Sequence, residues 1–209
     1  NAEVEFKNFI EKTGIPSAWT ILGVSAIPTD HPLNVGMLGM HGNYGPNVLT
    51  NECDLLIAIG MRFDDRVTGN LNSYAKQAKI IHFEIDPAEI DKNVLVDVPV
   101  LGNVKNTLSE ILDLVNNNNH NDWVAKFNEF YKVEYEKVID KEYNKTNGGL
   151  SMAEVIRTIN ENTSGESILV TDVGQHQMVA CRYTKFKLSK SNITSGGLGT
   201  MGFALPAAF

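Results

Sequence analysis

The sequence predicts an α/β fold built on a doubly wound parallel sheet, with a second α/β unit beginning after residue 149. Three observations lead to this prediction. Short apolar segments recur along the first part of the chain, stretches with helical spacing separate them, and a polar break at residues 116–121 ends the series. Short apolar strands that alternate with helices are typical of a parallel sheet whose two faces are covered.

Strands and helices alternate through the first domain, for which we expect the bounds 1–120. Four apolar segments predict strands, at residues 15–22, 55–59, 80–86 and 98–102. Three stretches predict helices, at residues 4–10, 43–53 and 104–115. Gly14 suits the C-cap of the first helix, and Gly60 closes the second strand. Pro99 indicates that the last strand lies at an edge, because proline cannot donate a hydrogen bond to a neighbouring strand.

The polar break separates this domain from a linker and connecting helix, expected at residues 121–149. Within it, residues 122–144 are charged and aromatic with helical spacing, and the sequence Asn-Gly-Gly at 147–149 ends the helix. Such glycine-containing polar segments are typical of connections between folded units. We therefore expect residues 150–209 to belong to a different domain.

This last part begins with Ser151 and Glu154, which fit a capping box at the start of a helix. A strand at residues 167–171 and a loop at residues 172–178 follow. The glycine-rich residues 194–207 are typical of a strand-to-helix turn that lets the backbone approach a ligand. Because the chain ends two residues later on an apolar Ala-Ala-Phe, we expect it to be a piece of a larger protein.

Composition and charge limit the classes of function. The chain has 209 residues, 43% of them hydrophobic, which suffices for one good core or for one core and part of a second. A formal net charge of −7 without a basic block argues against nucleic acid as a partner, and no apolar run reaches the length of a membrane span. Glycine turns and helix N-termini can still bind phosphate groups. Cys53 and Cys181 form no CxxC pattern and are typical of reduced cytosolic thiols.

Two segments of the first domain form one candidate site. Residues 36–42 are a glycine-punctuated loop, and residues 61–69 place two arginines and two aspartates directly after a predicted strand. Ligands of parallel sheets bind beyond the carboxyl ends of the strands, and arginine makes bidentate contacts with phosphate. A salt-bridged surface loop, in which Arg62 or Arg66 pairs with a nearby aspartate, is equally consistent with these residues.

A second candidate site combines residues 172–178 with residues 195–202. Three glycines within residues 197–202 match the pattern GxGxxG, which permits a nicotinamide-binding interpretation, but the acidic ribose partner would lie beyond the end of the chain. His176 lies between two glutamines and suits contacts with a phosphate or a pyrimidine. The alternative is a helix N-terminus that caps itself.

Four of these segments together resemble one family. Residues 36–42, 62–69, 174–178 and 194–207, in this order and at suitable spacing, look like the catalytic large subunit of the acetolactate synthases, which are also called acetohydroxyacid synthases and depend on thiamine diphosphate. The similarity runs over essentially the whole chain. It implies that the first 120 residues are a Rossmann-like, FAD-binding central domain. It also implies that the chain from residue 150 onward is the truncated N-terminal part of the C-terminal, thiamine-diphosphate-binding domain.

The resemblance also implies which residues contact the cofactors. Those that match FAD contacts are Thr20, Ile21, Leu22, Leu38, Gly39, Met40, His41, Gly60, Arg62, Asp64, Arg66, Val67, Glu84, Ile85, Glu89, Asn103 and Val104. Those that match thiamine diphosphate contacts are Val173, Gly174, Gln175, His176, Gly199 and Met201. Asn103 stands where the family usually has aspartate, and Val179 and Asn192 replace frequent aromatic residues.

The family's metal-binding motif and its activating glutamate match no position in this chain. The resemblance therefore implies that the chain holds neither a catalytic residue nor a metal ligand, and we expect it to be inactive by itself. The parent enzyme would use FAD, thiamine diphosphate and Mg²⁺ in the cytoplasm. It would condense two pyruvates to 2-acetolactate and CO₂, or pyruvate and 2-oxobutyrate to 2-aceto-2-hydroxybutyrate, in branched-chain amino-acid biosynthesis.

The same resemblance implies a homodimer or homotetramer of catalytic subunits, with a small regulatory subunit as a further partner and neither nucleic acid nor membrane. Two alternatives stay open: a related carboligase or oxidase, such as glyoxylate carboligase or pyruvate oxidase, and a nucleotide-binding module without catalysis. If residues 150–209 are the truncated part of a domain, they lack the rest of their sheet. An incomplete sheet exposes unpaired strand edges and an apolar face. We therefore also expect residues 150–209 to dock on a second copy or on their own first domain, and the chain to self-associate.

Overall fold

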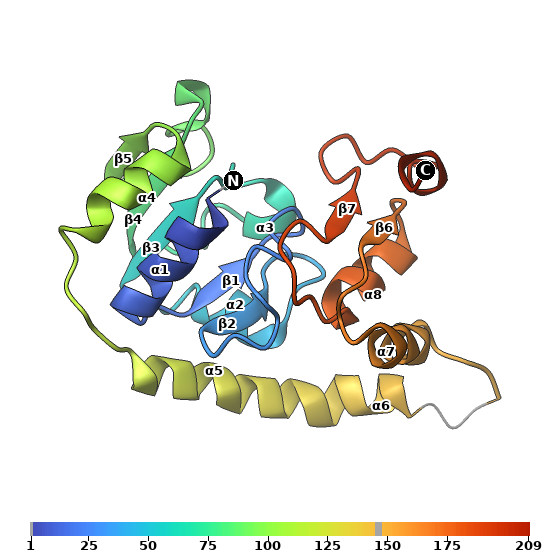
Figure 1. The fold of residues 1–209 in the computed structure, drawn as a ribbon. Coiled ribbons are helices and arrows are strands. Elements are labelled where there is room, and N and C mark those ends of the chain that lie inside the picture. The colour runs from blue at the N-terminus through green and yellow to red at the C-terminus, as the bar shows by residue number, and fades with distance from the viewer. Residues whose placement is uncertain (1, 145–147) are drawn as a thin grey trace.

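The computed structural model describes residues 2–144 and 148–209, which form two α/β regions and a long helix between them (Figure 1). The first region contains α1 (Glu3–Thr13), β1 (Ser17–Trp19), β2 (Asn34–Met37), α2 (Tyr44–Leu49), β3 (Leu55–Ile59), α3 (Asp65–Thr68), β4 (Lys79–Glu84), a 3₁₀ turn (Pro87–Glu89), β5 (Val98–Leu101) and α4 (Val104–Leu112). The long helix consists of α5 (Asn121–Glu134), a π-helical turn (Tyr135–Ile139) and α6 (Asp140–Tyr143). The second region contains α7 (Met152–Thr163), β6 (Leu169–Thr171), α8 (Gln175–Tyr183), β7 (Asn192–Thr194) and α9 (Ala204–Ala207).

The strand pairs of the described residues are all parallel, which confirms the predicted α/β class. The strands form three sheets, β1–β2, β3–β4–β5 and β6–β7. β5 pairs only with β4 and so lies at a sheet edge, as its proline predicts. The first region does not contain one continuous sheet, because β1 and β3 are not hydrogen-bonded to each other. β2 has no counterpart among the predicted strands.

Two elements of the first region are shorter than predicted. The strand expected at residues 15–22 is confined to β1, because the chain turns directly after Trp19. The helix expected at residues 43–53 is confined to α2. Beyond it, the side chain of Asn51 accepts a hydrogen bond from the backbone N–H of Ala75 at 2.8 Å, which ties the chain to the next loop.

In the second region the capping box is confirmed, and the predicted loop is partly wrong. The hydroxyl of Ser151 accepts from the backbone N–H of Glu154, and the carboxylate of Glu154 accepts from the backbone N–H of Ser151. The loop expected at residues 172–178 ends early, because α8 begins at Gln175. Gly174, at a φ of 152°, makes the turn into this helix in a conformation that other residues rarely adopt.

The connecting helix predicted at residues 122–144 is confirmed, with a π-helical turn in its second half. It runs beneath both regions (Figure 1). Its last helical residue is Tyr143, so it ends before the predicted Asn-Gly-Gly terminator. Of that terminator, Asn147 lies outside the described residues.

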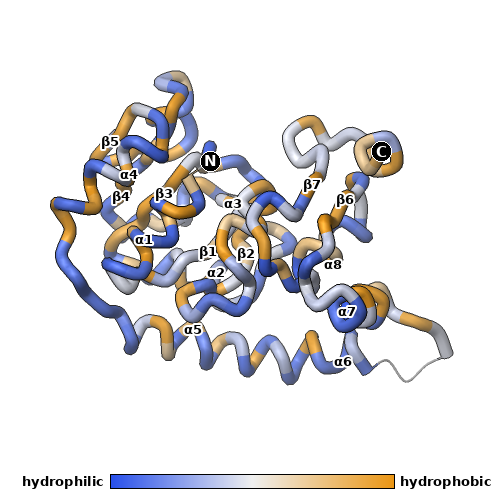
Figure 2. Tube along the Cα trace, in the orientation of Figure 1, coloured by the Kyte–Doolittle hydropathy of each residue, from blue (hydrophilic) through white to orange (hydrophobic). Residues whose placement is uncertain are grey.

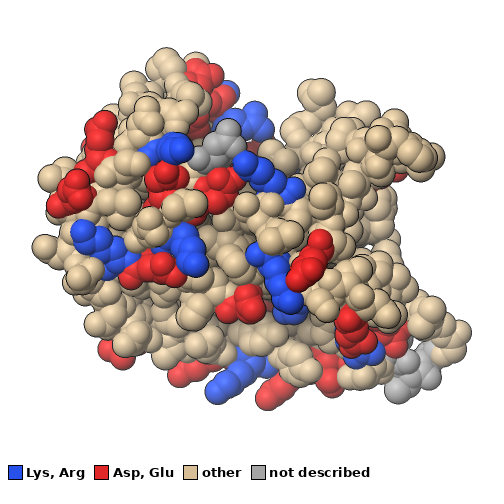
Figure 3. All heavy atoms as spheres, viewed as in Figure 1, with Lys and Arg blue, Asp and Glu red and all other residues tan. Residues whose placement is uncertain are grey.

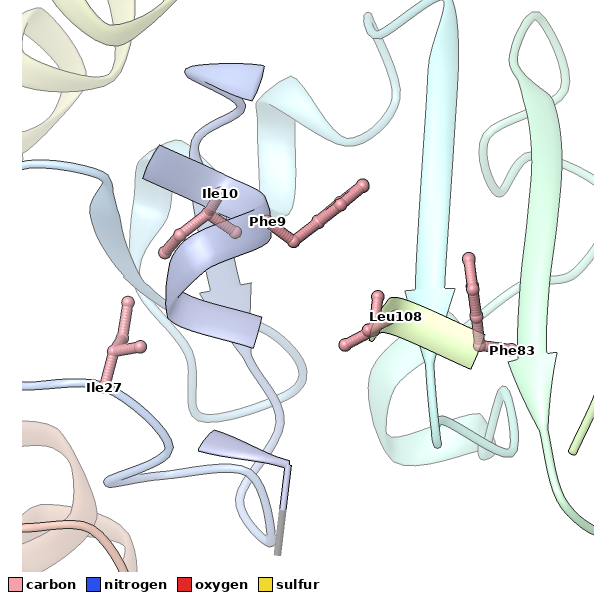
Figure 4. Close-up of a cluster of buried hydrophobic side chains, with 5 residues drawn as sticks. All are labelled: Phe9, Ile10, Ile27, Phe83 and Leu108. Carbon is pink, nitrogen blue, oxygen red and sulfur yellow. The ribbon is translucent and has the colours of Figure 1, made fainter. Parts of the chain in front are cut away.

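Each face of the sheet β3–β4–β5 carries a buried hydrophobic cluster, which accounts for the near-continuous apolar runs of β3 and β4. On one face, Phe83 of β4 belongs to a cluster with residues from α1, α4 and the loop after β1, shown in Figure 4. The members of this cluster are Phe9, Ile10, Ile27, Phe83 and Leu108. A second cluster contains Ala58 and Ile80, whose side chains point to the opposite face because neighbouring strand residues alternate.

The second region packs on the first region of the same chain. Val24 and Met37 share a buried cluster with Cys181 and Phe186. The backbone N–H of Thr29 donates to the carbonyl oxygen of Phe186 at 2.8 Å, and the N–H of Phe186 donates to the Thr29 hydroxyl at 2.9 Å. One of the two expected docking modes is therefore present within a single chain, while self-association stays a prediction.

Candidate functional site

The predicted ligand-contacting residues of the first region follow three neighbouring strands. Gly60 and Arg62 come directly after β3, Glu84 and Ile85 lie at the end of β4, and Asn103 follows β5. Because these strands are parallel and in register, their carboxyl ends meet at one edge of the sheet. This is the edge at which open α/β sheets bind ligands.

The two segments that form the first candidate site lie against each other. The backbone N–H of Met40 donates to the carbonyl oxygen of Arg66 at 2.7 Å, which joins the loop after β2 to α3. Asn47 of α2 holds the same loop, because its side-chain oxygen accepts from the N–H of Gly39 and its side-chain nitrogen donates to the Gly39 carbonyl, both at 2.9 Å. Within the loop, Leu38 is half-buried, whereas the side chains of Met40 and His41 are exposed.

Gly39 is the position where this close approach requires glycine. Its φ is +104°, and a Cβ added there would lie 2.8 Å from the Arg66 carbonyl oxygen and 3.5 Å from a methyl group of Val67. A side chain at residue 39 would therefore push the loop away from α3. Asn47 was not among the predicted site residues, because a contact across eight positions leaves no pattern in the sequence.

The sequence left two interpretations open for Arg62 and Arg66, contacts with a phosphate or a salt-bridged surface loop. The structure gives a different answer for each arginine. The Arg66 guanidinium forms an ion pair with the Asp65 carboxylate at 2.7 Å, and Asp64 caps α3 by accepting from the backbone N–H of Arg66 at 2.9 Å. The Arg62 guanidinium is exposed, and within residues 2–144 and 148–209 it has neither an ion pair nor a hydrogen bond. The salt-bridged loop therefore describes Arg66 and does not describe Arg62.

Polar side chains shape the turns after β4 and β5. Glu84 is buried, and one of its carboxylate oxygens accepts from the backbone N–H groups of Ile85 at 2.8 Å and Asp86 at 3.2 Å. Its carboxylate therefore holds the turn, whereas the side chain of Ile85 is exposed. Glu89 pairs with a neighbouring lysine at 2.6 Å. Asn103 caps α4 by accepting from the backbone N–H of the second residue after it at 3.0 Å, and Val104, the first residue of α4, is half-buried.

The second candidate site is also brought together by parallel strands. β6 and β7 pair in register, so the segments that follow them begin at the same end of their sheet. The carboxylate of Asp172 accepts from the backbone N–H of Ala204 at 2.6 Å, which links the turn after β6 to the start of α9. The side chain of Gln177 is buried and donates to the Thr194 hydroxyl at 2.5 Å. Gln177 is thus a support for the site rather than a ligand contact.

The residues predicted to contact thiamine diphosphate surround this link. Val173 and Gly174 form the turn before α8, while the side chains of Gln175 and His176 are exposed in its first turn. A helix does begin here, as the alternative interpretation predicts, but it does not cap itself, because no side chain of the described residues makes a capping hydrogen bond at its N-terminus. Gly199, at a φ of +68°, has open space around it, and the Met201 side chain is 80% exposed.

The two candidate sites approach each other at residues 20–22. The side chain of Asn192 donates to the backbone carbonyl of Ile21 at 3.3 Å. Leu22 lies so close to Gly196 that an added Cβ there would be 2.6 Å from a methyl group of Leu22. The segment predicted to line a flavin therefore touches the loop predicted to contact thiamine diphosphate.

Glu134 of α5 is a supporting residue that the sequence did not reveal. Its buried carboxylate accepts from the backbone N–H of Tyr44 at 3.0 Å and from the Asn43 side chain at 3.4 Å, and it forms an ion pair with Arg182 of α8. These partners lie 48 to 91 positions away, so only the fold brings them together. Across the described part of the chain, no three His, Cys, Asp or Glu side chains are grouped so that they could hold a metal ion.

Comparison with known proteins assigns the chain to a family. Residues 1–111 match the model of the thiamine pyrophosphate enzyme, central domain, and residues 172–209 match that of the thiamine pyrophosphate enzyme, C-terminal TPP binding domain. The chain is 39% identical over 210 residues to the acetolactate synthase large subunit of Buchnera aphidicola subsp. Schizaphis graminum, which covers 100% of this chain and 36% of that protein. It is 43% identical over 204 residues to the same-named subunit of Lactococcus lactis subsp. lactis, at 97% and 35% coverage.

An acetolactate synthase of Mycobacterium bovis is 41% identical over 216 residues, which cover 99% of this chain and 34% of the relative. The chain thus spans about a third of the length of the curated relatives that it matches. The similarity extends over both regions and over the glycine-rich turn after β7. The chain belongs to the thiamine pyrophosphate enzyme family.

Proposed function

We propose that this chain is part of the large subunit of an acetolactate synthase, and that the full-length protein condenses two pyruvates to 2-acetolactate and CO₂. With 2-oxobutyrate as the acceptor, the product is 2-aceto-2-hydroxybutyrate. The observation that carries the proposal is the contact between the two candidate sites, where Leu22 meets Gly196 and Asn192 bonds to Ile21. Relatives of about 40% identity across the whole chain, named as acetolactate synthases, support it.

The residues of the first site fit FAD. Gly39 lets two backbone segments meet without an intervening side chain, and the unpaired, exposed guanidinium of Arg62 is available for a phosphate or a ring edge. The exposed side chains of Met40 and Ile85 offer apolar contacts at the same edge of the sheet. FAD would serve this enzyme without net redox chemistry. Residues 1–120 are accordingly proposed as its central FAD-binding domain.

The residues of the second site fit thiamine diphosphate, which when bound supplies the nucleophilic carbon for attack on a 2-oxo acid. The backbone N–H groups at the start of α8 suit a diphosphate, because a helix N-terminus offers donors that have no intrahelical partners. The turn after β7 lets a ligand approach the backbone, because a Cβ at Gly197 or Gly199 would have no neighbour among the described residues within 4 Å. The exposed Met201 offers an apolar side chain for the rings. Because the family's metal-binding motif matches no position in this chain, we propose that other parts of the full-length protein hold Mg²⁺.

We further propose residues 121–149 as a linker and residues 150–209 as part of the thiamine-diphosphate domain, in a cytoplasmic homodimer or homotetramer that a small regulatory subunit can join. The test is an assay of the full-length protein with pyruvate, thiamine diphosphate, Mg²⁺ and FAD. Formation of acetolactate is expected. Consumption of oxygen with pyruvate, or carboligation of glyoxylate alone, would replace the proposal with a related oxidase or carboligase. The 209-residue chain alone should form no acetolactate above a heat-killed control.

The two arginines provide a test of the flavin site in the full-length protein. Replacing Arg62 by alanine should weaken flavin affinity by about 1.5–3 kcal/mol, or roughly ten- to a hundredfold, because it removes a charge-assisted contact. Replacing Arg66 should have the same effect only if its guanidinium leaves Asp65 for the flavin, and otherwise should leave affinity unchanged. Lys76→Ala, which removes an exposed cation from a different loop, is the matched control and should leave affinity unchanged. Fluorimetric titration measures the effect, and wild-type affinity in both arginine variants would contradict the assignment.

A further inference from the structure

Glu134 lies at an unusual place for a charged residue. It is the last residue of α5, which belongs to the connecting helix, and yet its carboxylate is buried. The side chains of Phe127 and Phe130 lie against the start of α2, where a Cβ added to Gly45 would be 3.2 Å from the Cβ of Phe130. This close packing brings Glu134, one helical turn after Phe130, to the residues that precede α2. The π-helical turn begins directly after Glu134, and such turns are frequent at functional sites.

Three groups share the Glu134 carboxylate. The backbone N–H of Tyr44 donates to it at 3.0 Å, the side-chain nitrogen of Asn43 lies 3.4 Å from both of its oxygens, and Arg182 forms an ion pair with it. Arg182 provides the opposite charge that a buried carboxylate needs. Asn43 is the N-cap of α2 and Tyr44 is its first residue. Glu134 therefore caps α2 in place of the Asn43 side chain, which is left for another contact.

That other contact closes the loop after β2. The side-chain oxygen of Asn43 accepts from the backbone N–H of Met37 at 2.9 Å, and the backbone N–H of Asn43 donates to the Met37 carbonyl oxygen at 2.8 Å. Gly36 makes room for this pair, because a Cβ added there would lie 2.5 Å from the Asn43 side-chain oxygen. One pair of residues therefore holds both ends of the loop 37–43, which contains the predicted FAD contacts at residues 38–41.

The charge of Glu134 decides which way the Asn43 amide points. An asparagine amide has a donor end and an acceptor end, and a half-turn exchanges them. An ionised carboxylate only accepts hydrogen bonds, so it favours the orientation in which the nitrogen of Asn43 faces Glu134 and the oxygen faces Met37. The reversed amide would place its oxygen against the carboxylate and its N–H groups against the N–H of Met37. Both contacts would then be lost.

We propose that Glu134 is a positioning residue for the flavin: it orients the Asn43 amide and thereby holds the loop 37–43 in the shape that binds FAD. The inference rests on the proposed function, because it takes this loop to contact FAD. The ion pair with Arg182 of α8 anchors the carboxylate from the second region. A residue of the connecting helix thus acts on a cofactor loop to which it does not belong.

A cycle of variants of the full-length protein tests the proposal by fluorimetric flavin titration and by amide hydrogen exchange. Glu134→Gln lets the Asn43 amide reverse, because glutamine offers both a donor and an acceptor. Flavin affinity should fall about tenfold, and the N–H of Met37 should exchange faster. Asn43→Asp should also weaken flavin binding, because two carboxylates then face each other. Glu129→Gln, which removes an exposed carboxylate from the same helix, is the matched control and should change neither measurement.

The double variant Glu134→Gln/Asn43→Asp separates positioning from a general loss of stability. The introduced glutamine can donate to the introduced aspartate, which can still accept from the N–H of Met37. Flavin affinity should therefore return to within about twofold of wild type, although each single substitution weakens it. Losses that add in the double variant would overturn the proposal, because a merely structural role predicts accumulation. Wild-type flavin affinity in Glu134→Gln would overturn it as well.

The two measurements distinguish a failure of this inference from a failure of the proposed function. If Glu134→Gln speeds the exchange of Met37 while flavin affinity stays at its wild-type value, Glu134 holds the loop but does not position the flavin, and the proposal is overturned. If the wild-type protein binds no flavin, the proposed FAD site fails instead. The exchange of Met37 in the same variants then still decides whether Glu134 and Asn43 hold the loop.

Discussion

The two α/β regions bury their apolar residues in different ways. The first region has a three-stranded sheet with a separate hydrophobic cluster on each face. The second region has a two-stranded sheet, and its fully buried phenylalanine, Phe186, lies in a cluster shared with the first region. Its buried Tyr183 packs instead with Ala153 and with Ile139 of the long helix. A two-stranded sheet is marginal on its own. The second region therefore depends on the first for part of its core. The first region depends less on the second, because both of its sheet clusters consist of its own residues.

The surfaces of the two regions also differ, in their content of charged side chains. In the view of Figure 3, acidic and basic side chains are interspersed over the first region, whereas the surface around β6, β7 and α9 is largely uncharged. Figure 2 shows apolar stretches along α7 and near the C-terminus. Leu198, Leu205 and Phe209 are among the exposed residues there. An uncharged surface with exposed apolar side chains is typical of a surface that other polypeptide covers, which agrees with the proposal that residues 150–209 are only part of a domain.

The largest expected effect comes from removing one buried aromatic ring in each region, which tests whether the two cores are equally important for stability. Phe83→Ala and Phe186→Ala each remove a fully buried ring, and each should cost about 3–5 kcal/mol of unfolding free energy. Phe83→Ala should destabilise the whole chain, because the second region loses its support when the first unfolds. Phe186→Ala should loosen mainly the second region. Urea unfolding with hydrogen exchange measures both, and protected α8 amides in a chain whose first region has unfolded would contradict the dependence.

Titration of Cys181 gives a somewhat smaller effect at the seam between the regions. Burial raises the pKa of the Cys181 thiol from its ordinary value of 9.0 to about 11. The unfolded chain then loses this proton at lower pH than the native chain. The stabilisation is fully present below pH 9 and is lost as the pH rises through 11, by about 2–3 kcal/mol in total.

Cys181→Ala isolates this contribution. The variant retains Cys53, whose thiol pKa burial also raises, so only the difference in slope between the two proteins belongs to Cys181. Unfolding free energies of wild type and variant should be measured between pH 8 and pH 11, and they should converge as the pH rises. Between the unfolded and the native pKa of Cys181, their difference should shrink by about 1.4 kcal/mol per pH unit. Parallel curves would mean that the thiol is accessible to water in the native state.

A third test breaks the link between α5 and α8. Glu134→Gln keeps the shape of the side chain but removes the charge that pairs with Arg182, and it should cost about 1.5–3 kcal/mol. The loss should appear as weaker protection of α8 more than of β4. Glu129→Gln changes an exposed carboxylate on the same helix and should stay within about 0.5 kcal/mol of wild type. Equal effects of the two substitutions would show that Glu134 does not hold the regions together.

The sequence predicted best the features that local chemistry decides. The bounds of β3 were predicted to the residue, because five apolar residues lie between Asp54 and Gly60. The edge position of β5 followed from Pro99, which has no N–H to donate. β2 was not predicted, because its sequence Asn-Val-Gly-Met has neither an apolar run nor a clear alternation.

For the candidate sites, the sequence identified the segments and their pairing but not the side chains that hold them. Residues 36–42 do lie against residues 61–69, and the turns after β6 and β7 do meet. Asn47 and Glu134 support these loops through contacts that depend on how distant segments pack. The spacing of residues along the sequence does not predict such contacts. The roles of the predicted cofactor-binding residues stay predictions that the flavin titration and the activity assay can test.

The smallest expected effect concerns the start of the second region. The Ser151 hydroxyl accepts from the backbone N–H of Glu154 at 3.0 Å and donates to the carbonyl oxygen of Glu142 at 2.5 Å, which ties α7 to α6. Ser151→Ala should cost about 1 kcal/mol of unfolding free energy, since it removes an N-cap. Ser151→Asp should recover most of it, because aspartate caps as well as serine does.

Ser189→Ala, at an exposed turn of the same region, is the matched control for that test and should change stability by less than about 0.5 kcal/mol. Urea unfolding of the four proteins gives the free energies. If the second region depends on the first, the loss in Ser151→Ala should appear as weaker protection of α7 amides, while the amides of β4 stay as in wild type. If the β4 amides lose as much protection as the α7 amides, both regions unfold as one cooperative unit. The two regions would then differ in the composition of their cores and not in their stability.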